Sequence, residues 1–513
     1  MLFIFEFCNR TDYVIIKWLR TSVQALFMTK EKTEREIYSM QKESRNTAIS
    51  AIVVALVTLA TYLPYFKNTY GIDTSTMILS QKQMLDGYLS QGRFGIVWLF
   101  HLFIRNYNNQ IVPFIVVPLL VLAGIYLYFI LKKFDKSSSN FALTLFAIVF
   151  INNPVVYSQL YFKMQAIHIV IGLFCVLIGT HLCLSENKNI VKIIGGAFLF
   201  GFSLLIYQVF AFFIFSMFLL SMLLFKEKRT QILQSMFPSL VIAGIIYVIS
   251  YIIASMTINY SSYGTETYMM WNKLGTLGGF QKLGAILMAL IALGYAALFV
   301  ITALRLKSGK KVDRLLLVLL IGSILTFNIA FGNVRPAPRV YFGAFSVVFA
   351  AILYLLAKKG GQYKWLAAAV TLLSVLFTFG LSQRANHSYD NDVKLTQEVV
   401  AYSKANNIPA SDFDKTNVVF LGYLQAGNQG IYRKLQDIFI TGATRTSFFQ
   451  FDPPLTSVRP YDFMKTQGYS FAIPDQALRT QMTTQYSGLP DYPNEKAFTY
   501  DPANKTVVVK LSN

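Results

Sequence analysis

An aspartate, Asp73, stands where the chain leaves its first long apolar run. The segment reads Tyr70-Gly-Ile-Asp73-Thr-Ser, so we expect the carboxylate at the face of a membrane. A carboxylate in that position is suited to act as a general base towards a substrate carried by a lipid. Aspartate is also favoured at the start of a helix, and a capping role before Thr74 and Ser75 stays open beside the catalytic one.

Two arginines, Arg335 and Arg339, enclose a short loop that contains two prolines. We predict this loop on the same side of the membrane as Asp73, where the topology rule requires no positive charge. A guanidinium fork matches the geometry of a phosphate group, so the pair favours a phosphate site. The alternative is that both side chains only anchor lipid headgroups.

Amide, hydroxyl and aromatic groups gather in two further segments of that side. One follows Asn152-Asn-Pro and includes the cation Lys163, and the other lies between two short apolar runs. Such groups could line a sugar pocket, although a polar turn with tyrosines at the membrane interface has the same composition. The candidate residues for the sugar and the acceptor are Tyr157, Gln159, Gln165, Tyr207 and Gln208.

Composition defines the class of protein. The chain has 513 residues, of which 54% are hydrophobic and 14% are charged. These values exclude a soluble globular protein and a disordered one, and they indicate a polytopic membrane protein. The net charge of +21 is assigned to cytoplasmic loops, so no nucleic-acid partner is expected. Three cysteines without a paired spacing exclude a disulfide framework and a zinc site.

The elements that must position these residues are membrane spans. Apolar runs of about 17–25 residues are long enough to cross a bilayer as helices. Lysines and arginines crowd every alternate connection, as expected for cytoplasmic loops, which places the N-terminus inside and, after an odd number of spans, the C-terminal part outside. We predict eleven spans, at residues 47–66, 111–131, 140–152, 166–184, 191–207, 208–225, 232–256, 282–305, 315–332, 341–357 and 365–383.

Three regions follow: a cytoplasmic tail (1–46), a transmembrane region (47–384) and an outer region (385–513). The loop at 67–110 is too apolar for open water, so we expect interfacial helices on the outer leaflet. The predicted fold class is an all-α polytopic membrane protein of the plasma membrane with a small extracytoplasmic α/β domain. In that domain we expect helices at 391–407, 428–439 and 475–487, strands at 418–422, 470–473 and 506–511, and a turn at 501–505.

Two Asp-x-Asp triplets occur in the outer region, at Asp390 and Asp392 and at Asp412 and Asp414. In soluble glycosyltransferases this pattern binds a metal ion and a nucleotide sugar. We expect both triplets outside the cell, where nucleotide sugars are not expected, and the region is too short for such a fold. We therefore predict solvated loops, no metal site and no cofactor.

The chain resembles the GT-C superfamily of membrane glycosyltransferases, and more closely the serotype-converting glucosyltransferases of the GtrII type, which glucosylate O-antigen. The likeness covers roughly residues 50–380, and the order of its short motifs carries it. Many relatives have a second acidic residue beside the first, whereas Thr74 follows Asp73 here, which leaves open a contribution of Asp86. The motifs are Tyr70-Gly-Ile-Asp73-Thr, Gly92-Arg93-Phe94-Gly95, Asn153-Pro154 with Gln159, Phe162 and Gln165, Tyr207-Gln208, and Val334-Arg335.

The resemblance implies a hexosyltransferase with a polyprenyl-phosphate sugar, most simply undecaprenyl-phosphate glucose, as the donor. The acceptor would be a glycopolymer of the bacterial cell surface, and the reaction one inverting displacement on the outer face. Asp73 would take the proton of the acceptor hydroxyl, while Arg93, Arg335, Arg339 and Lys163 would hold the leaving phosphate. A donor synthase and a flippase would be partners in the same membrane.

Other functions remain open at the level of sequence. A lipid-linked glycan flippase or transporter would need charged or glycine- and proline-broken helices at mid-membrane depth, and few such residues occur. A glycopolymer polymerase would also use outer arginines, but with large outer loops rather than an aspartate directly after the first span. A receptor with an outer sensor domain is the third alternative.

Overall fold

The computed structural model of the protein describes residues 34–135, 138–185, 190–257, 309–326, 337–424, 431–442, 445–453 and 455–512. Its contacts divide the chain into two units, residues 1–53 and residues 54–513. In the first unit the described residues belong to helix α2 (Glu34–Thr61), which continues into the second. The predicted span at 282–305 and the candidate Arg335 lie outside the described residues.

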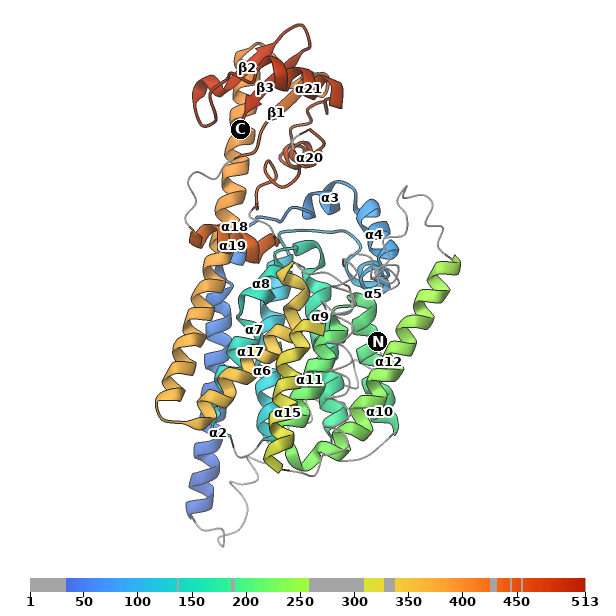
Figure 1. The fold of residues 1–513 in the computed structure, drawn as a ribbon, viewed down its shortest axis with the longest axis vertical. Coiled ribbons are helices and arrows are strands. Elements are labelled where there is room, and N and C mark those ends of the chain that lie inside the picture. The colour runs from blue at the N-terminus through green and yellow to red at the C-terminus, as the bar shows by residue number, and fades with distance from the viewer. Residues whose placement is uncertain are drawn as a thin grey trace. The chain divides into compact units, whose positions relative to one another are not determined.

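Helices that run alongside one another form the greater part of residues 54–513 (Figure 1). Seven described helical segments are long and apolar enough to cross a membrane, and three shorter apolar helices accompany them. Every predicted span except 282–305 overlaps a described helix, so the chain is a helical membrane protein; the number eleven stays a prediction. Besides α2 and α18 (Gln362–Ala405), the described helices of the bundle are α6 (Val112–Phe134), α7 (Asn140–Ile151), α8 (Pro154–Leu160), α9 (Lys163–Leu184), α10 (Ile190–Ile206), α11 (Phe210–Leu224), α12 (Arg229–Thr257), α15 (Gly309–Gly322) and α17 (Phe342–Lys359).

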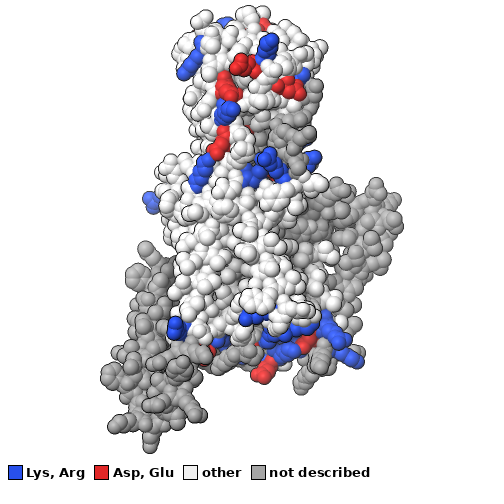
Figure 2. All heavy atoms as spheres, turned by 90° about the vertical axis from the view of Figure 1, so that its left-hand side faces the viewer, with Lys and Arg blue, Asp and Glu red and all other residues white. Residues whose placement is uncertain are grey.

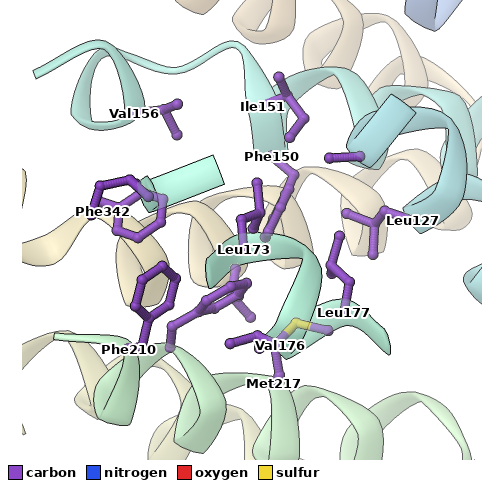
Figure 3. Close-up of a cluster of buried hydrophobic side chains, with 14 of the residues drawn as sticks. Leu127, Phe150, Ile151, Val156, Leu173, Val176, Leu177, Phe210, Met217 and Phe342 are labelled. Atoms are coloured by element: carbon purple, nitrogen blue, oxygen red, sulfur yellow. The ribbon is translucent and has the colours of Figure 1, made fainter. Parts of the chain in front are cut away.

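Bulky apolar side chains fill the centre of this bundle. Figure 3 shows Phe150, Leu173, Phe210 and Phe342 gathered there from α7, α9, α11 and α17. A Cβ atom at Gly172 would lie 2.5 Å from the ring of Phe210, so glycine is needed for α9 and α11 to approach so closely. Lipid tails are as apolar as these side chains, and close packing of this kind is therefore what holds membrane helices together.

A polar corner separates α7 from α8. The side chain of Asn153 accepts hydrogen bonds from the backbone N–H groups of Val155 and Val156, which caps α8. Its amide nitrogen donates to Ser346 Oγ on α17 at 2.9 Å. The predicted motif Asn153-Pro154 therefore has a structural role. It lies at the corner between α7 and α8, and Asn153 ties this corner to α17.

Short helices make up the first predicted outer loop, as expected. They are η1 (Leu63–Phe66), α3 (Thr74–Leu79), α4 (Gln81–Ser90), α5 (Phe94–Leu99) and the π-helical turn η2 (Phe100–Ile104). Helix α5 packs against α10 and α3 packs against α20 (Arg459–Thr466). The loop thus joins the helical bundle to the C-terminal part of the chain.

Helix α18 (Gln362–Ala405) is 44 residues long and runs from the bundle into the C-terminal part (Figure 1). It combines the predicted span at 365–383 with the predicted helix at 391–407. Beyond it lies a small sheet in which β3 (Thr506–Lys510) is the middle strand, parallel to β1 (Asn417–Leu421) and antiparallel to β2 (Phe498–Asp501). Helices α19 (Ile431–Thr441), α20 and α21 (Gln476–Gln485) complete this part.

The predictions for the C-terminal part are largely confirmed. Strands occur at two of the predicted places, and β2 and β3 are joined by the predicted turn at 501–505. The strand predicted at 470–473 is wrong, because this segment makes only an isolated bridge between Asn417 and Ala472. Strand β2 and helix α20 were not predicted. A domain boundary at 384 stays a prediction, and α18 passes through it without a break.

Charged side chains are unevenly distributed along the bundle. Figure 2 shows Lys and Arg at both ends of the bundle, a band almost free of charge between them, and mixed charges on the C-terminal part. The basic end away from the C-terminal part includes the turn η3 (Lys226–Lys228), the start of α15 with Lys311 and Arg314, and the end of α17 with Lys358 and Lys359. A band of this kind is the surface expected to face lipid.

Candidate active site

Asp73 lies directly before α3, at the N-terminal cap position of that helix. Among the described residues its side chain finds no capping hydrogen bond. Instead, Nη1 of Arg459 donates to Oδ1 of Asp73 at 2.7 Å. The Asp73 side chain is 39% exposed, so the carboxylate is accessible to solvent. The capping interpretation of Asp73 is therefore not supported by its contacts.

The residues before Asp73 fix its position from two sides. Tyr70 and Ile72 are buried in the same apolar cluster as Phe463 of the C-terminal part. Between them, a Cβ atom at Gly71 would lie 2.7 Å from the carbonyl oxygen of Tyr161, so only glycine fits against that backbone. The motif Tyr70-Gly-Ile-Asp73 thus inserts two side chains into the C-terminal core and leaves the third, Asp73, at its edge.

Arg459 is held between two carboxylates. Its Nη1 contacts Asp73, and its Nε donates to Oδ2 of Asp452 at 2.5 Å. The guanidinium carbon also lies 5.2 Å from the ring centroid of Phe451. Burial alone would lower the pKa of Arg459, but the charges of Asp73 and Asp452 outweigh it and raise that pKa above its ordinary value.

Arg93 is positioned by the two glycines of its motif. Gly92 has φ +71°, and a Cβ atom there would lie 2.9 Å from the hydroxyl of Tyr247. A Cβ atom at Gly95 would lie 2.8 Å from the backbone nitrogen of Ile206, at the end of α10. Both glycines thus let the chain press against neighbouring helices, and Arg93 is carried to the turn between α10 and α11, where Tyr207 lies.

The predicted sugar residues Gln165 and Tyr207 meet at Arg93. Nη1 of Arg93 donates to Oε1 of Gln165 at 3.2 Å, and its guanidinium lies 4.5 Å from the ring centroid of Tyr207. The Nε atom of Arg93 is buried and has no hydrogen-bond partner in the described part of the chain. Three motifs that are far apart in the sequence therefore converge on one cation with an unused donor.

Gln208 lies beside this cluster and has the partner that a buried glutamine requires. Its Nε2 donates to the carbonyl of Gln91 at 2.6 Å and to the hydroxyl of Tyr247 at 2.9 Å. Its Oε1 is buried and makes no hydrogen bond to any described residue. Gln208 thus braces the turn that carries Arg93 and still offers an acceptor.

Tyr88, on α4, connects the carboxylate with the cation. Its hydroxyl is buried, and no described residue forms a hydrogen bond with it. Burial raises the pKa of Tyr88, the charge of Arg93 lowers it, and the charge of Asp73 raises it. Both charged groups therefore act on one tyrosine hydroxyl, which brings the predicted base and a predicted phosphate ligand into the same site.

Lys163 and Tyr157 lie in a neighbouring cavity. It has a volume of about 10 Å³, close to the space one water molecule needs, and Tyr65 and Ser382 also line it. Nζ of Lys163 donates to the carbonyls of Tyr65 and Lys67 at 3.2 and 3.0 Å, so this cation is engaged with backbone. Gln159 is fully buried, and neither amide atom has a partner among the described residues.

Arg339 lies at the start of α17, in η7 (Pro338–Tyr341). Its guanidinium lies 4.5 Å from the ring centroid of Phe162, and its Nη1 donates to the carbonyl of Thr441 at 3.2 Å. These contacts connect Arg339 to the segment before Lys163. Arg335 cannot be placed beside it, because it lies outside the described residues.

The prediction of solvated loops at the Asp-x-Asp triplets is wrong, because Asp390 and Asp392 lie in α18 and Asp412 and Asp414 lie in the short 3-10 helix η8 (Ala410–Lys415). Asp390 forms an ion pair with Lys67, and buried Asp392 accepts from Ser447 Oγ at 2.5 Å and from the backbone N–H of Phe448 at 2.9 Å. Asp412 pairs with Lys415. The described residues hold no group of three or more His, Cys, Asp or Glu side chains that could bind a metal ion.

Sequence reasoning missed Arg459, Asp452 and Tyr88. Arg459 follows Asp73 by 386 residues, so no local pattern connects the two. Tyr88 lies within the predicted interfacial helices, where a tyrosine is ordinary. The signal that could have singled it out is its position between Asp73 and the glycine pair around Arg93.

Together these residues offer a partly exposed carboxylate, a partly buried guanidinium whose buried Nε has no partner among the described residues, and amide groups with unused hydrogen-bonding atoms. A carboxylate of this kind can take a proton, and a guanidinium can hold an anion. The arrangement suits the transfer of a group from an anionic leaving group to a hydroxyl.

Comparisons with known proteins agree with this chemistry. A family model described as glucosyl transferase GtrII matches residues 63–383. This stretch includes Asp73, Tyr88, Arg93 and Arg339, and it ends before Arg459. Searches of curated proteins and of solved structures gave no match. The match to more than half of the chain, on a helical membrane protein with this site, shows that the chain belongs to the GtrII glucosyl transferase family and is a glycosyltransferase.

Proposed function

We propose that this glycosyltransferase moves glucose from a polyprenyl-phosphate carrier to a cell-surface glycopolymer. The reaction takes place on the outer face of the plasma membrane, and a donor synthase and a flippase in the same membrane supply the donor. The basic end of the bundle faces the cytoplasm, and the end with Asp73 faces outwards. Figure 1 supports this orientation, because the connections from α11 to α12 and from α17 to α18, which carry Lys226, Lys228, Lys358 and Lys359, lie at the end of the bundle away from the C-terminal part.

The step is one inverting displacement. The acceptor oxygen attacks the anomeric carbon while the bond from that carbon to the phosphate oxygen breaks. The proton of the acceptor hydroxyl goes to Asp73, and the electron pair of the broken bond leaves with the polyprenyl phosphate. The phosphate group needs no proton in order to leave, so the mechanism requires one base and no acid.

The observation that carries this proposal is the convergence of Gln165 and Tyr207 on Arg93, whose buried Nε has no hydrogen-bond partner among the described residues, in the loop that also presents the partly exposed Asp73. A base and an anion-binding cation must lie on opposite sides of a reacting carbon, within the length of one sugar. We assign the leaving phosphate to Arg93, with Arg339 and Arg335 as further ligands and Lys163 beside them. The sugar and the acceptor are assigned to Tyr157, Gln159, Gln165, Tyr207 and Gln208.

A transfer assay tests the proposal. Purified protein in lipid nanodiscs is incubated with polyprenyl-phosphate glucose, radiolabelled in the sugar, and a surface-polymer extract. Label in the polymer is expected with the native chain and with Asp390→Asn, which removes only a surface ion pair with Lys67. Loss of transfer in Asp73→Asn supports the assignment. Passage of the labelled lipid across the bilayer without transfer would instead favour a flippase.

A further inference from the structure

Arg459 reaches the active site from a part of the chain that the family match does not include. The match ends at residue 383, whereas Arg459 begins α20. Its two ion pairs, to Asp73 and to Asp452, are the contacts that bring a cation of the C-terminal part to the proposed base. The ion pair between Arg459 and Asp73 therefore indicates a role beyond attaching the C-terminal part to the bundle.

We infer that Arg459 is a positioning residue that fixes the orientation of the Asp73 carboxylate, with one oxygen engaged and the other free to take a proton. The inference rests on the proposed function, in which Asp73 is the base. Asp452 supports this role, because it pairs with Nε of Arg459 while Nη1 contacts Asp73.

The geometry supports a fixed orientation. Nη1 and Nε lie on different edges of the planar guanidinium, and each edge contacts a different carboxylate. Nη1 also lies 3.4 Å from the carbonyl oxygen of Ile72, next to Asp73 in the chain. Arg459 engages Oδ1 of Asp73, which leaves Oδ2 to take the proton of the acceptor.

Within the described part of the chain, Arg459 is the cation in direct contact with Asp73. Arg93 contacts Gln165 and Tyr207 instead and is assigned to the phosphate.

Attachment of the C-terminal part does not require this ion pair. Tyr70 and Ile72 are already buried in its core beside Phe463. In addition, Gln467 Nε2 donates to the hydroxyl of Tyr70 at 3.0 Å. A merely structural Arg459 would therefore duplicate stronger contacts a few residues away.

The test separates kcat from KM for transfer at neutral pH, with polyprenyl-phosphate glucose and the surface-polymer extract as substrates. Arg459→Gln should lower kcat roughly tenfold and leave the KM values for donor and polymer near those of the native chain, because a misoriented base slows the reaction without weakening binding. Arg459→Lys should recover part of the loss, because an ammonium can still pair with Asp73. Asp452→Asn should lower kcat in the same way but by less.

Two controls separate the possible outcomes. Arg445→Gln removes a guanidinium that lies over the Tyr423 ring, and it should leave kcat and both KM values unchanged. Thermal unfolding of each variant is measured beside transfer. A loss of kcat that accompanies a loss of thermal stability, without recovery in Arg459→Lys, would assign Arg459 a structural role and overturn the inference, and a raised KM for the polymer with a native kcat would make it an acceptor ligand.

Failure of this inference is distinct from failure of the proposed function. Full activity in Asp73→Asn would remove the base and both proposals with it. An inactive Asp73→Asn together with a native kcat in Arg459→Gln and Asp452→Asn would overturn only the role of Arg459.

Discussion

The guanidinium carbon of Arg93 lies 4.5 Å from the ring centroid of Tyr207, while its Nη1 donates to Oε1 of Gln165. A cation held by a ring and an amide keeps its remaining donors for another ligand. The buried Nε of Arg93, which no described residue satisfies, is such a donor. This arrangement makes Arg93 the first residue to test for binding of the donor phosphate.

Replacement of Arg93 should impair use of the donor. Arg93→Lys keeps the charge but loses the planar fork and its contact with Tyr207, and Arg93→Ala loses both. A charge-assisted hydrogen bond contributes about 1.5–3 kcal/mol, so we expect kcat/KM for the donor to fall roughly ten- to a hundredfold, more in Arg93→Ala. Arg105→Lys, an exposed arginine of the same loop, is the control. Unchanged donor dependence in both Arg93 variants would refute the assignment.

Asp73→Asn should abolish transfer without unfolding the protein. A general base contributes about 10²–10⁴-fold to the rate, and asparagine cannot take the proton. The side chain makes no capping hydrogen bond with described residues, so little stability should be lost. Transfer is measured beside thermal unfolding of the same preparation. A folded variant with native activity would leave Asp73 without a catalytic role and reopen the question of Asp86.

Gly95→Ala should destabilise the contact between α5 and α10. The added Cβ atom would lie 2.8 Å from the backbone nitrogen of Ile206 and 2.9 Å from its Cγ1. Overpacking of this kind costs about 1–3 kcal/mol, which should lower the midpoint of thermal unfolding in detergent.

Gly87→Ala is the matched control, because a Cβ atom at Gly87 would meet nothing within 4 Å among the described atoms. Alanine inside a helix is more stable than glycine by about 0.5–1 kcal/mol, so this variant should be as stable as the native chain or slightly more so. Equal losses in both variants would contradict the packing argument.

A buried ion pair joins α18 to α19. Nε and Nη2 of Arg384 donate to the two oxygens of Asp437 at 2.9 and 3.1 Å, and Asp437 is fully buried. Removal of one partner from such a pair costs about 3–5 kcal/mol, so Asp437→Asn and Arg384→Met should each lower the thermal midpoint clearly. The double variant Arg384→Met with Asp437→Leu should lose less than either, as measured by a double-mutant cycle. Simple additivity would show that the two residues do not interact.

The orientation of the chain can be tested with one added cysteine. Gln485 lies on the exposed end of α21, while Cys175 and Cys183 are buried. In a chain that also carries Cys8→Ser, Gln485→Cys should react with a membrane-impermeant maleimide on intact cells. Reaction only after permeabilisation would place the C-terminal part in the cytoplasm and contradict the proposed outer site.

The helices were readily predicted because a bilayer leaves few alternatives. A backbone in lipid must satisfy its own polar groups, so long apolar runs form helices. Helix α18 was predicted in two pieces, yet residues 384–391 contain neither proline nor glycine, and nothing interrupts the helix there. Strand β2 was missed because Phe498-Thr-Tyr-Asp is short and only partly apolar.

The candidate site was predicted in part. Asp73, Arg93, Gln165, Tyr207 and Gln208 lie in motifs whose order resembles a known family, and the structure brings the last four together. Arg459 could not be found in this way, because its contact with Asp73 depends on how Tyr70 and Ile72 enter the core of the C-terminal part. Contacts between residues so far apart in the sequence are set by tertiary packing, so the hydrophobic periodicity of the sequence cannot predict them.

The place of β3 in the sheet has a consequence for the timing of activity during synthesis. β3 is the middle strand, and its Val507 and Val509 share a core with Tyr70 and Ile72. The ribosome makes the loop with Asp73 long before it makes β3, since even Arg459 comes 386 residues later. A nascent chain whose bundle is already inserted therefore has an unsupported base. On the proposed topology, export of β3 across the membrane completes the site, so unfinished chains do not consume the lipid-bound sugar.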